Sequence, residues 1–175
     1  MEVVVMNGNL GSAMFSKDLR YRFVLGRTFP EFEEEAPVSI CQFIMLNPST
    51  ADHDFSDPTV TLCINYARRW GHTGLLVTNL FGLRATDPRE LKKVDDPFGE
   101  GNTKFVLGTA QQPEVTRVIC AWGTHGAFKN AGPDMVELLW QHGVAPYALA
   151  LTKEGHPVHP LYQRADIKPV LLAGE

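Results

Sequence analysis

Short polar side chains gather directly after an apolar run in the first third of the chain. In chain order these residues are Asn47, Pro48, Ser49, Asp52, Asp54 and Asp57. The amide of Asn47 can both donate and accept hydrogen bonds, so it could hold a water molecule or a substrate edge. A carboxylate such as Asp52 or Asp54 could act as a general base or stabilise positive charge on a sugar. Asp57 precedes Pro58 and is expected to cap a helix instead.

A second group of polar and aromatic side chains follows later apolar runs. Residues 156–162 read HPVHPLY, and the two prolines restrict the ring of His159, which favours a donor to a developing oxyanion. Asn79 could read the edge of a base, and Phe81 could stack on that base. Arg84 could contact a phosphate group. Each of these residues also has a structural interpretation, as a turn residue or, for Phe81, as a core residue.

The same residues define the metal chemistry that the chain could support. His156, His159 and His125 could bind zinc, but no cysteine pair completes such a site. Asp52 and Asp54 could hold magnesium through carboxylates and waters, whereas the glycine and glutamate of a calcium loop are missing. We therefore predict a site without a metal or cofactor, with a metal-dependent hydrolase that uses Asp52 and Asp54 as an alternative.

Apolar runs alternate with helical patterns along the chain. The predicted strands cover residues 38–46, 74–83, 115–122 and 146–151, and the predicted helices cover residues 58–70, 95–112 and 132–140. This order predicts an α/β fold with three α/β/α layers and a central, mostly parallel four-stranded sheet. Extra N-terminal edge strands could include residues 21–25. We expect one domain over residues 1–175, in which residues 1–19 could be a loosely attached segment.

Composition narrows the class of protein. The chain has 175 residues, of which 44% are hydrophobic and 21% are charged, as in ordinary globular proteins. Its net charge of −4 argues against a protein that coats DNA non-specifically but allows a local basic patch. Three dispersed cysteines and no apolar run of membrane-spanning length predict a cytoplasmic protein without a membrane partner.

The predicted site lies where the strands end. Ligands of open α/β sheets bind beyond the carboxyl ends of the strands, and here those ends carry polar or aromatic residues. The predicted catalytic residues are Asn47, Asp52 and His159. The predicted substrate-binding residues are Pro48, Ser49, Asn79, Phe81, Arg84, Trp122, His125 and Tyr162.

The order of short motifs resembles that of a bacterial and phage family, DUF1643, which is defined only as a domain of unknown function. The motifs are FIMLNPSTAD, DPT, TNLF, RATDP, AWG and HPLY, and the likeness covers about residues 21–168. This resemblance implies no established activity.

The chain also resembles, more distantly, the uracil-DNA glycosylase superfamily. Asn47 and Pro48 are similar to its first motif, His159 and Pro160 to its last, and Asn79 to its middle segment. The resemblance implies that Asn47 positions the hydrolytic water, Asn79 selects the base, and His159 stabilises the base as it departs.

These observations predict an uncharacterised protein with a glycosylase-like site. We expect this site to hydrolyse or recognise a base in nucleic acid or in a nucleotide. One alternative is a binding module that recognises a nucleotide or modified base without catalysis. The other is the metal-dependent hydrolase described above.

Overall fold

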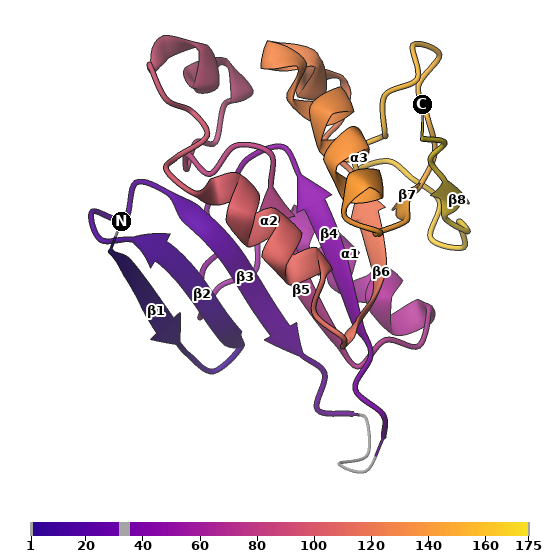
Figure 1. The fold of residues 1–175 in the computed structure, drawn as a ribbon. Coiled ribbons are helices and arrows are strands. Elements are labelled where there is room, and N and C mark those ends of the chain that lie inside the picture. The colour runs from indigo at the N-terminus through magenta and orange to yellow at the C-terminus, as the bar shows by residue number, and fades with distance from the viewer. Residues whose placement is uncertain (1, 32–35, 175) are drawn as a thin grey trace.

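The computed structural model describes residues 2–31 and 36–174, which form a mixed sheet with helices on both faces (Figure 1). The strands are β1 (Val3–Asn7), β2 (Gly11–Ser16), β3 (Arg22–Thr28), β4 (Ile40–Met45), β5 (Gly74–Asn79), β6 (Val115–Cys120), β7 (Pro146–Ala148) and β8 (Val170–Leu171). The α-helices are α1 (Pro58–Arg69), α2 (Asn102–Ala110) and α3 (Ala131–Gln141), and the 3-10 helices are η1 (Pro88–Lys93) and η2 (Thr124–Asn130).

The strand order is β1-β2-β3-β5-β4-β6-β7-β8. The prediction of a four-stranded sheet was wrong, because only β5, β4, β6 and β7 form the parallel part. Strands β1, β2 and β3 extend one edge in antiparallel pairing, and β8 extends the other. Residues 1–19, which we expected to be a loosely attached segment, thus contain two paired strands, β1 and β2. The single domain stays a prediction.

Two apolar layers separate the helices. Side chains of α1 pack on one face against β4 and β5, and those of α2 and α3 pack on the other face against β4 and β6. Strands β5 and β6 lie on opposite sides of β4, so two crossovers of the usual hand place α1 and α2 on opposite faces. The chain therefore leaves β4 and β6 in opposite directions, which opens a crevice beyond their carboxyl ends.

Local sequence explains where the helices begin. Helix α1 begins at Pro58, and Asp57 caps it by accepting a hydrogen bond from a first-turn backbone N–H, as predicted. The predicted helix over residues 95–112 was wrong at its start, because Gly99 and Gly101 have φ angles of +82° and +76°. None of the helices in the described part of the chain combines the length and apolar character that a membrane span requires.

A β-bulge in β3 decides which face Arg22 occupies. The register between β2 and β3 skips Phe23, so β3 contains one extra residue at this point. Leu25 packs on the α1 face, whereas Phe23 stacks on Phe105 of α2, with ring centroids 4.7 Å apart. The extra residue returns Arg22 to the α1 face, where it lines a cavity with Val77.

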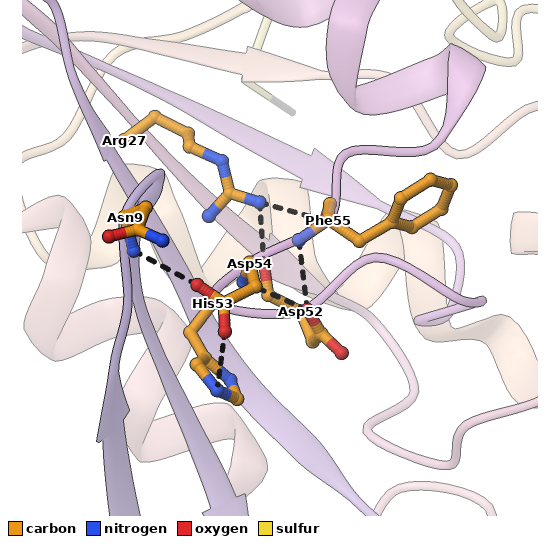
Figure 2. A network of polar contacts seen from close by, with 6 residues as sticks. All are labelled: Asn9, Arg27, Asp52, His53, Asp54 and Phe55. Carbon is orange, nitrogen blue, oxygen red and sulfur yellow. Dashed lines mark hydrogen bonds and ion pairs between the residues drawn. The ribbon is translucent and has the colours of Figure 1, made fainter.

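Two buried arginines of β3 hold the loop between β4 and α1. Nη2 of Arg27 donates to the backbone oxygens of Asp52, at 2.6 Å, and Phe55, at 2.9 Å (Figure 2). Nη1 of Arg22 donates to the backbone oxygen of Ala51. The backbone carbonyl groups of the loop after β4 therefore fix this loop to strand β3.

Replacing Arg27 by Met should destabilise the protein through this loop. The substitution leaves the carbonyls of Asp52 and Phe55 without their donor, so the free energy of unfolding should fall by about 1–3 kcal/mol. Urea denaturation measures the change. The control, Arg164→Met, removes an exposed ion pair with Asp166 and should leave the midpoint near that of the wild type. Equal effects of the two substitutions would contradict this role of Arg27.

Candidate functional site

A cavity of about 720 Å³ lies beyond the carboxyl ends of β4, β5 and β6. Its walls come from the turn after β4, the first turn of α1, the end of β5, the turn after β6 and residues of the 152–161 segment. The cavity thus occupies the crevice at which the chain leaves β4 and β6 in opposite directions.

The structure brings part of the predicted site together in this cavity. The predicted residues that line it are Asn47, Ser49, Asn79, Trp122, His125 and His159. The predicted residues outside its lining are Pro48, Asp52, Phe81, Arg84 and Tyr162. The asparagines and the histidine on which the glycosylase resemblance rests therefore share one cavity.

Asn79 is a buried amide without hydrogen-bond partners. Its side chain is 1% exposed, and neither Oδ1 nor Nδ2 has a partner within the described residues. Asn79 is the last residue of β5 and lines the cavity together with Val77, two positions earlier on the same face of the strand. An unpaired buried amide costs about 1–3 kcal/mol, and a water molecule or a ligand with both a donor and an acceptor can satisfy its two polar atoms.

The amide nitrogen of Asn47 forms hydrogen bonds that link two segments at the edge of the cavity. Nδ2 donates to the backbone oxygens of Ala85, at 2.7 Å, and Pro48, at 3.1 Å. The backbone N–H of Ala85 in turn donates to the oxygen of Pro48, which joins the turn after β4 to the segment after β5. No hydrogen bond reaches Oδ1 of Asn47 within the described residues. This oxygen can accept a hydrogen bond from a water molecule or a ligand.

A backbone hydrogen bond and burial both favour the neutral form of His159. Its Nδ1 accepts a hydrogen bond from the backbone N–H of Leu161 at 3.2 Å, so the neutral ring carries its proton on Nε2. Burial lowers the pKa of His159 below its ordinary value, and the negative charge of Asp57 opposes this shift. The backbone N–H of Gly123 donates to the oxygen of Pro157, which holds the histidine segment against the turn after β6.

Arg22 lines the cavity but was not among the predicted residues. It is 2% exposed, its Nε has no partner, and no ion pair joins it to a carboxylate within the described residues. Burial lowers its pKa to about 10, and the charge of Asp57 opposes this shift, so the guanidinium stays protonated at neutral pH. An arginine within an apolar strand could have indicated a functional residue. The sequence did not indicate the bulge that places Arg22 on the side of the cavity.

Asp57 is the carboxylate of the cavity. It is 9% exposed, and its Oδ1 caps α1 at 2.8 Å from the backbone nitrogen of Val60. No hydrogen bond reaches Oδ2 within the described residues. Its charge acts on Arg22 and on His159, which also line the cavity. The capping role that the sequence assigned to Asp57 thus occupies one oxygen and leaves the other able to accept a hydrogen bond.

The structure places Asp52 outside the cavity, in a turn of its own. Oδ1 of Asp52 accepts from the backbone N–H groups of Asp54 and Phe55, both at 2.9 Å, and these bonds lower its pKa (Figure 2). Asp54 contacts Asn9 and His53 instead of sharing a site with Asp52. Across residues 2–31 and 36–174, no group of three or more His, Cys, Asp or Glu side chains is arranged to hold a metal ion.

The other predicted contacts also lie elsewhere. Phe81 is fully buried and packs against Phe98, with ring centroids 4.8 Å apart, so it has no free face for a base. Arg84 lies over the ring of Phe15 at 5.1 Å, and Tyr162 is 99% exposed. The backbone oxygen of Pro48 accepts hydrogen bonds from Nδ2 of Asn47 and from the backbone N–H of Ala85. The residue types at the strand ends predicted these substrate contacts, but the side chains do not line the cavity, and for Pro48 only the backbone takes part in hydrogen bonds at its edge.

The chain matches a family described as "Protein of unknown function (DUF1643)" over residues 22–161. This match covers well over half of the sequence. The chain belongs to the DUF1643 family. The cavity lining runs from Arg22 to Leu161, so every residue that lines it falls inside the part that this DUF1643 protein shares with its family. No curated protein and no solved structure shows significant similarity to the chain.

Replacing Asp57 by Asn should lower the pKa of His159 further. The substitution removes the negative charge that favours the imidazolium form, and asparagine still caps a helix. NMR titration of the imidazole nitrogens measures the change. His72 serves as the internal control, because burial and Arg117 shift its pKa and Asp57 does not. An unchanged titration of His159 would show that Asp57 does not act on this ring.

Proposed function

We propose that the cavity binds a nucleobase, in nucleic acid or in a nucleotide, and that the protein hydrolyses the N-glycosidic bond of that base. The observation that carries this proposal is the buried amide of Asn79, whose two polar atoms are unpaired beside the cavity. A base edge with one donor and one acceptor satisfies both atoms.

The remaining groups fit the charges of the reaction. Breaking an N-glycosidic bond develops positive charge on the sugar and negative charge on the base. The carboxylate of Asp57 and the free Oδ1 of Asn47 suit the sugar and an attacking water, whereas Nε2–H of His159 suits the base as a donor. Asp57 takes the role first assigned to Asp52, because Asp57 is the aspartate that lines the cavity.

The resemblance to the uracil-DNA glycosylase superfamily supports the same assignment. Its three motifs correspond here to residues around Asn47, Asn79 and His159, and these three residues line one cavity. The assignment by motif and the assignment by unpaired atoms thus agree, although they rest on different observations.

A glycosylase assay tests the proposal. The purified protein is incubated with single- and double-stranded oligonucleotides that contain uracil, hypoxanthine or modified pyrimidines, and with the corresponding nucleotides. We expect an abasic product or a free base, and a rate about a hundredfold lower in Asn79→Ala and His159→Ala, since each loses a hydrogen bond to the reacting base.

Matched controls come from the same residue types outside the cavity. Asn65→Ala and His142→Ala change exposed residues and should keep the wild-type rate. Absence of product from every substrate, together with unchanged ligand binding in the Asn79 and His159 variants, would overturn the proposal.

A base-binding module without hydrolysis is the second candidate. It is favoured by Asn47, whose Nδ2 is committed to two backbone oxygens, so that a single atom remains to position water. A thermal-shift screen with nucleotides separates the two functions. Stabilisation without any turnover supports the module.

A further inference from the structure

The buried guanidinium of Arg22 lines the cavity, and the proposed reaction assigns it no role. Arg22 begins β3 and Asn79 ends β5, and since these neighbouring strands are antiparallel, both residues lie at the same edge of the sheet. Both line the cavity and are 2% and 1% exposed. Among the polar and charged residues that line the cavity, Asn79 and Arg22 are therefore the least exposed.

The guanidinium has donors to spare. Within the described residues, its one hydrogen bond runs from Nη1 to the backbone oxygen of Ala51, and Nε has no partner. A buried arginine with unused donors is costly unless an acceptor, and above all an anionic one, completes its hydrogen bonds. The charged groups that act on Arg22 are Asp57 and Asp52, which favour its charged form, and Arg84 and Arg27, which oppose it.

The hydrogen-bonding groups of Arg22 and Asn79 limit which ligand can bind against both residues. A phosphate offers acceptors to Arg22 but no donor for Oδ1 of Asn79. A base that places an exocyclic amino group at this position would direct a donor toward the N–H donors of Arg22. A base with a carbonyl oxygen beside a ring nitrogen satisfies the guanidinium through its oxygen and the amide through the neighbouring edge.

We infer that Arg22 binds the departing base as an anion, so that the cavity takes an oxopyrimidine or oxopurine whose negative charge faces the buried guanidinium. The inference rests on the proposed function and assigns its leaving group. Arg22 is a catalytic residue in this sense, because it touches the base on which charge develops.

The step balances as a hydrolysis. The electron pair of the broken C–N bond stays on the ring nitrogen and spreads to the carbonyl oxygen that Arg22 holds. The oxygen of water forms the new bond to the sugar carbon, and the proton that water loses passes to the carboxylate of Asp57. The base anion later takes a proton from solvent, and Asp57 releases its own.

Binding of free bases tests the inference without any need for turnover. The probes are 5-fluorouracil and xanthine, each titrated by calorimetry about one pH unit below and above its own pKa. We expect the wild type to bind the better-fitting probe at least about fivefold more tightly at the higher pH, because the ionised fraction rises about tenfold. The non-ionising 1,3-dimethyluracil reports any titration of the protein itself.

Variants assign the effect to one residue. Arg22→Gln should remove the preference for the ionised base, and Arg22→Lys, which keeps the charge, should retain it at lower affinity. The matched control is Arg164→Gln, which changes an exposed arginine that does not line the cavity, and it should behave as the wild type. If Arg22→Gln does not fold, the wild type and Arg22→Lys decide the question.

The outcomes separate the inference from the function. Binding that ignores ionisation in the wild type, or a preference that persists in Arg22→Gln or disappears in folded Arg22→Lys, overturns the role of Arg22 and leaves base recognition standing. Failure of the wild type to bind either probe at both pH values overturns base recognition, and the inference with it.

Discussion

The site depends on the hydrogen bonds between the guanidinium groups of β3 and the backbone carbonyls of the loop after β4. Buried guanidinium groups need acceptors, and the carbonyls of an irregular buried loop need donors, so each satisfies the other. Arg27 holds the oxygens of Asp52 and Phe55, and Arg22 holds that of Ala51. Asp57 follows this fixed segment, so the carboxylate of the cavity is placed by the same bonds.

Sheet topology explains why the groups converge there. The turns after β4 and β6 diverge because β5 and β6 lie on opposite sides of β4, and the space between these turns stays open. The antiparallel strand β3 adds a group that a purely parallel sheet would not supply. Its first residue, Arg22, lies at the edge of the sheet where β5 ends, and the backbone N–H of Arg22 donates to the oxygen of Gly82 just beyond β5. One of the N-terminal edge strands, β3, therefore contributes directly to the cavity through Arg22.

The sequence predicted the parallel strands and the positions of Asn47, Asn79 and His159 because each of these positions depends on where an apolar run or a proline-bounded segment stops. It could not predict side-chain direction beyond those ends. Asn79 and Phe81 are two residues apart, yet Asn79 borders the cavity and Phe81 packs among aromatic rings on the other side of the sheet. Arg22 escaped prediction for a related reason, since its face depends on a bulge that only the pairing of β2 with β3 determines.

The polar groups of the cavity keep unused hydrogen-bonding capacity because they do not pair with one another. The charge of Asp57 acts on Arg22, yet no ion pair joins these two residues, so each keeps hydrogen-bonding capacity that a direct pair would have consumed. Asn79 likewise forgoes the partners that a buried amide normally finds. A protein under selection for stability alone would pair these groups or replace them by apolar residues. Their arrangement, with a cation, an anion and an amide around one cavity, suits the proposed hydrolysis, because fixed charges need no reorganisation when charge develops on a ligand.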